Sequence, residues 1–580
     1  VNVRPTQHFF TNRLPAMNVS QFETAFSAFC LRGPDERQSL GSTQAIDSFS
    51  AVDQGSTQQD LDHARRLLTE LEHVETSTET QQRFSVDRIL YRLYLERFIL
   101  HATVTYNGLT NAAQMPIAAD RIGESIFGLL INDPRPEPAR IPDIIGRTQA
   151  IPAFLVDAQA QLKQPVSRWL DIEIASIKGL PDLLETAHAF VQTHLPEKAE
   201  VMGSAMHAAN AAFDAYVAQI QCLPVHKNFQ IGAQAAKQVM LSRGIVEEPS
   251  ELKGIASAFL ARTRDEIERL RVELATRYEQ DPAISAADLQ THLIEQYAVQ
   301  TEGPLENVLD RYRDEERKVL AFIASTNLFP IPDDQRIEIL RTPSFLEPTI
   351  PAGAMLAPAA LCEGTKKSLV YLTLSQELLA EHNELSIPVM MIHEGIPGHH
   401  LQLTWAASHP TFIRRVYDAM DLAEGWTTML EDYMLDEGYA GALTDEVRFM
   451  AKREICRLAA RVGIDLYFMT GGSHYLELDG FVPPESDDPF VKAGALLKSV
   501  TGFVDGRVQA ELNWYSKERG YPLSYLTGNH LMWSLKDAYT AKNGHGRASD
   551  RAFHEAVLHS GNMPLHVLRA LFKQKGLIDE

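Results

Sequence analysis

The sequence predicts a mainly α-helical protein with two lobes and a small β element. Apolar residues recur every three or four positions through much of residues 1–340, which is the spacing of one face of a helix. Near residue 341 the chain becomes richer in Pro and Gly, and one β-branched run follows at 368–374. The chain has 580 residues, which is longer than a single hydrophobic core usually serves. We therefore predict an N-terminal helical lobe at 1–340 and a second lobe at 341–580.

Two stretches of the predicted N-terminal lobe carry the helical spacing most clearly. In the first, apolar side chains form one stripe at Leu61, Ala64, Leu67, Leu68 and Leu71. In the second, the stripe is made by Leu252, Ile255, Ala256, Phe259, Ile267, Leu270 and Leu274. Both stripes predict helices that bury one face against the core.

The run from Ser368 to Leu374 has the β-branched and aromatic composition of a strand. Two roles are open for it at this stage. It could support the scaffold of the second lobe, or its edge could pair with an extended peptide. The helical spacing resumes after it, from near Ile387.

The charge balance limits the partners that we expect. Asp and Glu number 76 against 54 for Lys and Arg, which gives a net charge of −22. Nucleic acids and anionic membranes are bound through basic surfaces, so we expect neither as a partner. There is no run of 18 apolar residues, and the four cysteines are too far apart for a CxxC site. We expect a cytoplasmic protein, and the sequence predicts no oligomeric state.

The most informative segment is MIHEGIPGHHLQ at residues 391–402. His393, His399 and His400 lie within eight residues of one another, and Glu394 directly follows the first of them. Imidazoles bind zinc, and a carboxylate beside them can take a proton from a water molecule on the metal. The segment therefore predicts a catalytic metal site rather than a helix end with surface histidines.

The spacing differs from the HExxH motif of ordinary zinc peptidases, because Pro397 stands where the second histidine would be. On a regular helix His399 would lie ~240° around the axis from His393. A metal site therefore requires a break in the helix. Gly395, Pro397 and Gly398 are the residues that would make that break and return a histidine to the metal. The spacing alone leaves His399 and His400 open as the second ligand.

A third ligand is needed, and Glu424, 25 residues after His399, is the nearest strong candidate. The small Gly425 and the bulky Trp426 beside it indicate close packing rather than free surface. Glu431, seven residues further along the same helix face, is the alternative. The pair His554 and His559 spells HExxxH, but these histidines diverge by ~140° on a helix and no Gly or Pro interrupts them. We interpret His554 as an ordinary packed residue.

Four segments in order resemble the bacterial domain-of-unknown-function 885 family. They are HEGIPGHHLQ at 393–402, EGW at 424–426, YLTG at 525–528, and the block from FHE to GNMPL at 553–565. The N-terminal half is similar to the family only in its length and its helical character. One position departs from the pattern. Family members often carry Gly-Ile-His where this chain has Gly463-Ile464-Asp465, so a histidine that could assist the substrate is absent.

The family is grouped by fold with the glutamate-zincin metallopeptidases, which have two helical lobes beside a deep channel. The resemblance therefore implies a two-lobed, zincin-like fold with a short strand beside the metal helix and a catalytic lobe at 341–580. It also implies His393, His399 and Glu424 as the ligands of one Zn²⁺ per chain, with Glu394 as the general base.

These residues lead us to expect a zinc-dependent hydrolase that cleaves the amide bonds of short peptides. Tyr525 is the first choice for the donor to the oxyanion, because Pro522 and Gly528 bracket it as a loop residue. A buried core tyrosine is the alternative interpretation of that residue. His530, Arg507 and His474 are weaker candidates for the same role.

Two other functions stay open. The same metal site could hydrolyse the amide of a small molecule that is not a peptide. The helical lobes could instead form the cleft of a binding protein without catalysis. Glu394 beside His393 speaks against the second of these, because binding alone requires no general base.

Overall fold

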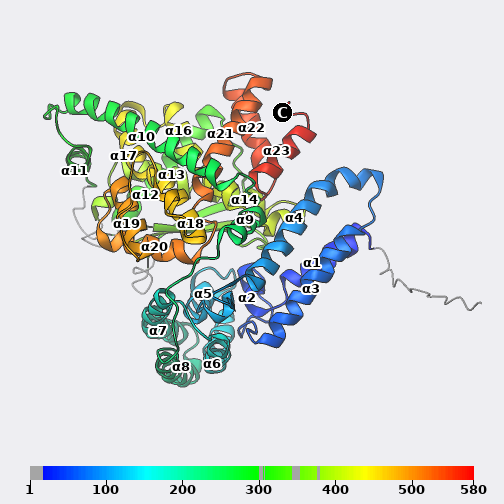
Figure 1. Ribbon diagram of the computed structural model, residues 1–580. Helices are drawn as coiled ribbons and strands as arrows, with labels where there is room; N and C mark the ends of the chain where they lie inside the picture. The colour runs from blue at the N-terminus through cyan, green and yellow to red at the C-terminus, as the bar shows by residue number, and fades with distance from the viewer. Residues whose placement is uncertain (1–16, 300–304, 306, 343–352, 375–378, 580) are drawn as a thin grey trace, which may run out of the picture.

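A computed structural model describes residues 17–299, 305, 307–342, 353–374 and 379–579 (Figure 1). The described chain is mainly helical, with small sheets, and this confirms the predicted helical class. Among the described residues, no helix is long and apolar enough to cross a membrane.

Helices make up most of the chain before the sheet. They are α1 (Val19–Cys30), α2 (Pro34–Ser39), α3 (Gln54–Glu72), α4 (Thr78–Thr103), α5 (Ala118–Ile131), α6 (Glu137–Gln161), α7 (Ser167–His194), α8 (Ala199–Ile220), α9 (Ala233–Ser242), α10 (Pro249–Arg277), α11 (Ala286–Gln296) and α12 (Asn307–Thr326). The two predicted stripes lie in α3 and α10, whose apolar faces are buried, as the spacing predicted. The short strands β1 (Thr105–Tyr106) and β2 (Leu109–Thr110) form a small hairpin after α4.

The main sheet has the order β3-β5-β4. Strand β3 (Gln335–Arg341) runs parallel to β5 (Lys366–Leu372), and β4 (Gly353–Leu356) runs antiparallel to it. The predicted strand is therefore present as β5, while β3 and β4 were not predicted. Because β5 is the central strand, paired with β3 along its whole length and with β4 along residues 369–372, it is not an edge strand, and the alternative in which its edge pairs with a peptide is wrong.

The chain after the sheet is again helical. Its helices are α13 (Ser386–Glu394), α14 (His399–Ala407), α15 (Phe412–Val416), α16 (Met420–Asp436), α17 (Thr444–Ile455), α18 (Arg457–Thr470), α19 (Pro489–Thr501), α20 (Asp505–Lys517), α21 (Ser524–Asn543), α22 (Arg547–Leu558) and α23 (Leu565–Gln574). In Figure 1, α5 to α8 form a bundle at the lower end of the molecule with α1 to α3 beside it. The helices from α9 onward gather in the larger body above.

The buried hydrophobic residues form three clusters, and each contains residues from both sides of position 340. One cluster joins Phe22 of α1 to Trp426 of α16. Another joins Trp169 of α7 to Leu466 of α18. The second half of the chain is thus held on a scaffold that the first half helps to build. The domain boundary near residue 340 stays a prediction.

Candidate metal centre

The helix that carries His393 ends one residue later, as its Gly and Pro residues predicted. Helix α13 stops at Glu394 and α14 begins at His399, so residues 395–398 form a short break. A Cβ on Gly398 would lie 2.0 Å from the backbone oxygen of His393, and only glycine therefore fits there. The break folds the chain back and places the rings of His393 and His399 with their centroids 4.9 Å apart.

Glu424 on α16 completes a group of three possible ligands. Its Oε2 atom lies 3.7 Å from Nε2 of His393 and 3.5 Å from Nε2 of His399. The candidate ligand atoms of the three residues all lie within 4.8 Å of one another. Ligand atoms about 2.1 Å from a tetrahedral zinc ion are about 3.4 Å apart, which is close to both measured separations.

The donor set fits a divalent metal ion. Glu424 is only 4% exposed, and among the described residues its Oε2 atom has no hydrogen-bond partner. A buried carboxylate oxygen that faces two imidazole nitrogens without a hydrogen bond is a costly arrangement in the absence of a ligand. Two imidazoles and one carboxylate are a common zinc set, although other divalent ions accept similar ligands.

The three residues also interact strongly as charges. Burial disfavours a charged His393 ring, but its interactions with Glu424 and Glu431 outweigh burial and raise its pKa to about 10. Burial alone would raise the pKa of Glu424, yet the two imidazoles hold it well below its ordinary range. The His393 ring therefore holds its second proton tightly, and a metal ion must displace that proton to bind.

Glu431 lies beside the three ligands but faces the other nitrogen of the first histidine. Its Oε1 atom is 2.7 Å from Nδ1 of His393. Metal-bound histidines commonly donate their second ring N–H to a carboxylate, which fixes the orientation of the ring. Glu431, the sequence alternative for the third ligand, is therefore placed to orient His393, and Glu424 is the carboxylate that faces both histidines.

His400 points away from the three ligands. Its Nδ1 atom lies 2.7 Å from Ser368 Oγ on β5, and its Nε2 atom lies 2.6 Å from Gln335 Oε1 on β3. Burial lowers its pKa to about 4, so the ring is neutral at pH 7. With both nitrogens engaged, His400 ties α14 to the sheet, and His399 is the histidine that the helix break returns to Glu424.

His554 is fully buried, and its contacts are those of a packed core residue. Its Nδ1 atom is 2.9 Å from the backbone oxygen of Leu328, and its ring stacks on Phe329 with a centroid distance of 4.2 Å. The ring also meets the edge of Trp426 at 5.5 Å. The interpretation of His554 as a packed residue agrees with this placement.

The general-base candidate, Glu394, is the last residue of α13 and is partly exposed. It is not among the three residues whose ligand atoms converge, and its role as general base stays a prediction. Against the effect of burial, its charge helps to raise the pKa of His393, so its carboxylate lies near the group.

Tyr525 lies near Glu424, but the prediction that it is a loop residue is wrong. It stands in the first turn of α21, because the loop before it closes at Leu523 and Ser524 begins the helix. The residue is partly exposed, and the guanidinium of Arg461 lies 4.3 Å from its ring centroid. The weaker candidates lie elsewhere: His474 and His530 are exposed, and Arg507 pairs with Glu454 at 3.4 Å.

The sequence analysis missed Tyr521. Its hydroxyl lies 3.1 Å from Oε1 of Glu424 and 3.5 Å from the hydroxyl of Tyr525. The only signal was its position four residues before Tyr525, in the segment Arg519-Gly520-Tyr521-Pro522. That spacing has no fixed meaning in a segment whose loop and helix boundaries are unknown.

Asp465 stands at the position where the resemblance to the family led us to expect a histidine. It is fully buried on α18 and accepts hydrogen bonds from the backbone N–H groups of Gly520 and Leu523, each at 3.1 Å. Burial raises its pKa to about 7, against the opposing effect of those two N–H groups. Asp465 therefore supports the loop ahead of α21 from inside the protein.

The close packing predicted around Glu424 is present. A Cβ on Gly425 would lie 2.4 Å from the carbonyl carbon of Gly528, so α16 and α21 touch backbone to backbone. On the other side of α16, the Nε1–H group of Trp426 donates to the backbone oxygen of Pro397 at 2.9 Å. These contacts fix α16 against both the tyrosine-bearing helix and the break after α13.

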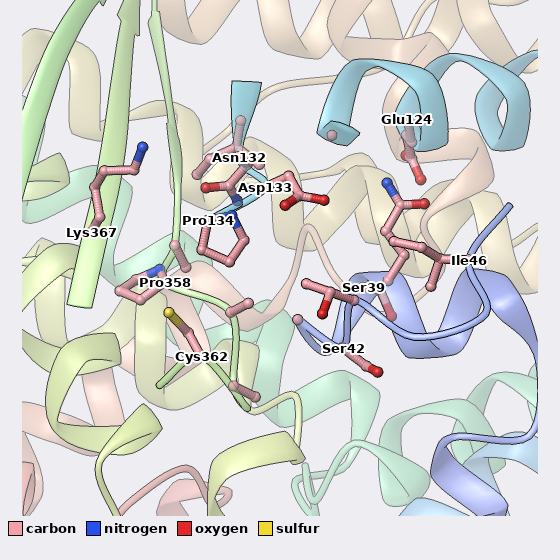
Figure 2. A pocket seen from close by; sticks show the side chains of 18 of the residues that line it. Ser39, Ser42, Ile46, Glu124, Asn132, Asp133, Pro134, Pro358, Cys362 and Lys367 are labelled. Atoms are coloured by element: carbon pink, nitrogen blue, oxygen red, sulfur yellow. The ribbon is translucent and has the colours of Figure 1, made fainter. Parts of the chain in front are cut away.

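A separate hollow lies between α2, α5 and the strands, away from the candidate metal centre (Figure 2). It has a volume of about 1240 Å³, and none of the three ligands lines it. Lys367 and Asp133 face it, but Lys367 pairs with Glu338 at 3.5 Å and Asp133 pairs with Arg135. The convergence of ligand atoms, rather than the size of a cavity, therefore locates the candidate site.

The sequence profile of a family described as bacterial proteins of unknown function, DUF885, matches residues 34–571. The chain belongs to this family. The DUF885 match includes every residue of the candidate metal centre. Among curated proteins, no sequence matches the chain.

Two solved structures share the fold of this DUF885 protein. One is a candidate lipoprotein of unknown function from Shewanella oneidensis, with 16% sequence identity, a TM-score of 0.70, and coverage of 95% of this chain and 99% of that chain. The other is a candidate lipoprotein from Colwellia psychrerythraea, with 15% identity, a TM-score of 0.76, and coverage of 95% and 98%. At these identities the likeness shows the fold alone.

Proposed function

We propose that this DUF885 protein is a zinc-dependent hydrolase that cleaves the amide bonds of short peptides. One observation carries the proposal. Nε2 atoms of His393 and His399 both face the same buried, unbonded oxygen of Glu424, at separations that suit a tetrahedral ion. Glu394 directly follows His393 in the chain. Its carboxylate is not required to bind the metal, because His393, His399 and Glu424 already supply three ligands.

When bound, a zinc ion would supply Lewis-acid polarisation of the scissile carbonyl and a lowered pKa for water. His393, His399 and Glu424 would hold it. Glu394 takes a proton from the attacking water and returns it to the leaving nitrogen, which is the usual task of a carboxylate in this position. Tyr525 donates its hydroxyl proton as a hydrogen bond to the oxyanion, an interaction that is typically worth about 3 kcal/mol.

The finer fold assignment and the substrate class belong to the same proposal. The helical fold with a short sheet beside α13 and α14 agrees with the two-lobed glutamate-zincin architecture. A site held between helices on a rigid scaffold favours short, flexible peptides over folded proteins. The descriptions of the two structural relatives as candidate lipoproteins favour the cell envelope over the cytoplasm that the sequence predicted.

Metal analysis combined with peptide turnover tests the proposal. Protein purified without chelators is assayed for bound metal and for cleavage of a fluorescence-quenched library of short peptides. We expect about one zinc ion per chain and measurable turnover. Glu394→Gln should keep the metal and lose about 10²- to 10⁴-fold in rate, because it removes only the general base. His399→Ala should lose the metal, and His474→Ala is the control on an exposed histidine.

Each alternative result has a definite meaning. Metal binding with turnover only of amides that are not peptides would contradict the substrate class and keep the hydrolase. Metal binding without any hydrolysis, or full activity in Glu394→Gln, would contradict the mechanism. Wild-type protein that takes up no zinc even when it is offered would leave a non-catalytic binding protein as the better explanation.

A further inference from the structure

The oxygen of Glu424 that does not face the histidines has its own partner. Oε1 of Glu424 lies 3.1 Å from the hydroxyl of Tyr521, while Oε2 faces the two imidazoles. The two oxygens of one carboxylate are thus assigned to different tasks. The partner comes from residues 518–523, the loop between α20 and α21, and not from α16 or the helix break.

The hydroxyl proton of Tyr521 is committed to this contact. In this contact the Tyr521 hydroxyl donates and Oε1 of Glu424 accepts at 3.1 Å, because a carboxylate that serves as a metal ligand is ionised and can only accept. The hydroxyl of Tyr525 is 3.5 Å from that of Tyr521, well beyond the usual length of about 2.7–2.8 Å for an O–H···O bond. Tyr525 also lies near Glu424, and burial and that carboxylate together raise the pKa of Tyr525, but the contact of 3.1 Å with Oε1 of Glu424 belongs to Tyr521.

The loop that carries Tyr521 is pinned from several sides. Asp465 accepts the N–H groups of Gly520 and Leu523, which flank Tyr521 on either side. The N–H group of Tyr521 itself donates to the backbone oxygen of Glu518 at 3.1 Å. The ring of Trp514 meets the Tyr521 ring edge-on with a centroid distance of 4.9 Å.

The shape of this loop is built into the backbone as well. Gly520 has φ = +74°, a conformation that other residues adopt only with strain. The turn places Tyr521 directly after that glycine, and the backbone oxygen of Tyr521 accepts from the N–H of Ser524 at 2.9 Å, where α21 begins. Tyr521 is thus held in place before any ligand binds.

We propose that Tyr521 is the positioning residue for the third metal ligand: it holds Oε1 of Glu424 so that Oε2 alone is presented with the two histidines. This inference rests on the metal site of the proposed function. It assigns different roles to two neighbouring tyrosines, with Tyr521 acting on the ligand and Tyr525 acting on the substrate. It also gives Asp465 a role, because this aspartate fixes the loop that delivers Tyr521.

The consequence is a ligand whose rotation is restricted. Without the Tyr521 hydroxyl, the carboxylate of Glu424 can turn about its terminal bond and present either oxygen, or both, to the ion. Groups that hold metal ligands in this way typically contribute 10- to 100-fold to metal affinity. The effect should appear in metal binding itself, whether or not the protein then turns over a substrate.

The test compares Tyr521→Phe with Tyr525→Phe, two variants that each remove one phenol oxygen from neighbouring positions. Zn²⁺ affinity is measured by competition with a chelator, and the visible spectrum of the Co²⁺-substituted protein reports ligand geometry. We expect Tyr521→Phe to lose about 10- to 100-fold in Zn²⁺ affinity and to change the Co²⁺ spectrum. Tyr525→Phe should stay near wild type in both measurements.

Circular dichroism of the metal-free variants shows whether they fold. If Tyr521→Phe does not fold, Asp465→Asn supplies the second variant, because it loosens the loop without touching Glu424, and it should lower Zn²⁺ affinity in the same direction. Equal affinities in wild type and Tyr521→Phe, or an equal loss in Tyr525→Phe, would overturn the inference and leave the proposed hydrolase standing. A wild-type protein that binds zinc tightly but hydrolyses nothing would refute the hydrolase and leave the inference to be decided by the variants. Wild type without any zinc binding would overturn both.

Discussion

Glu431 on α16 lies 2.7 Å from Nδ1 of His393 on α13, and this contact sets which ring nitrogen is available to a metal. A carboxylate accepts, so Nδ1 carries a proton, and a metal ion that displaces the other ring proton would bind at Nε2. That Nε2 atom is the one that faces Glu424. Helix α16 therefore supplies both a candidate ligand, Glu424, and the carboxylate that orients the candidate ligand His393, and the two lie seven residues apart on the same face.

Replacement of Glu431 should weaken metal binding in a graded way. Glu431→Leu removes the acceptor, and we expect a loss of about 10- to 100-fold in Zn²⁺ affinity because the His393 ring is no longer fixed. Glu431→Gln keeps a carbonyl that can still accept from Nδ1, so its loss should be smaller. Affinity is measured by chelator competition.

The matched control for this series is Glu437→Leu. Glu437 caps the same helix but pairs with Arg547 near the surface, so its replacement should leave Zn²⁺ affinity unchanged. If Glu431→Leu bound zinc as tightly as wild type, the contact with His393 would have no role in the site.

Bound metal should stabilise the fold, because the ligands come from three separate helices. A ligand present at 100 times its dissociation constant adds about 2.7 kcal/mol to the free energy of unfolding. Thermal unfolding followed by circular dichroism should therefore show a higher Tm with Zn²⁺ and a lower one after EDTA. His399→Ala should show no such difference, whereas an equal response in that variant would place the metal elsewhere.

The contact between Gly425 and Gly528 predicts a strong effect of one methyl group. A Cβ on Gly528 would lie 2.1 Å from the backbone oxygen of Asp421, and backbone cannot move aside without separating α16 from α21. We expect Gly528→Ala to lower the free energy of unfolding by several kcal/mol, beyond the roughly 1–3 kcal/mol of ordinary overpacking. Urea unfolding of the purified variant measures the change.

Gly179→Ala is the control for that experiment. Gly179 lies inside α7, and nothing lies within 4 Å of the position its Cβ would take. Alanine there should raise stability by about 0.5–1 kcal/mol, because it reduces the freedom of the unfolded chain. A Gly528→Ala variant as stable as wild type would mean that the two helices are not in backbone contact.

The helical class and the break after His393 were predictable because both depend on local chemistry. Apolar spacing of three and four identifies α3 and α10 regardless of their partners. A side chain at Gly398 would collide with the preceding turn. A glycine within an otherwise apolar helical segment indicates a position where the backbone is too close for a side chain. By contrast, β3 and β4 were missed, because a strand is stabilised by neighbours that are distant in sequence.

The residues of the candidate site also fall into those that the sequence could predict and those that it could not. His393 and Glu424 could be selected from the types and spacing of residues, whereas spacing left His399 and His400 open and the resemblance to the family favoured His399. Glu431 and Tyr521 act by touching a ligand from another element, and no spacing in the sequence encodes that contact. Tyr525 was placed in a loop because Pro522 and Gly528 flank it, yet Pro522 precedes the helix and Gly528 serves the contact with α16.

The buried carboxyl of Asp465 predicts a pH dependence of stability. Burial raises its pKa from 3.8 to about 7 in the folded protein. Below about pH 3.8 the group is protonated in both the folded and the unfolded state, so its contribution to stability is fully present. As the pH rises through 7, the unfolded chain releases the proton first, and the folded state loses up to about 4 kcal/mol relative to it.

Asp465→Asn isolates this contribution, because the variant carries no proton to lose at this position. The free energies of unfolding of wild type and variant are measured by urea at several pH values from 4 to 8. The difference between variant and wild type should shift in favour of the variant as the pH rises, and should level off above about pH 7. Other buried acids such as Asp421, whose pKa is also raised to about 7, are present in both proteins and cancel in the difference. A difference that stays constant from pH 4 to 8 would mean that Asp465 is ionised throughout, held in that state by the N–H groups of Gly520 and Leu523.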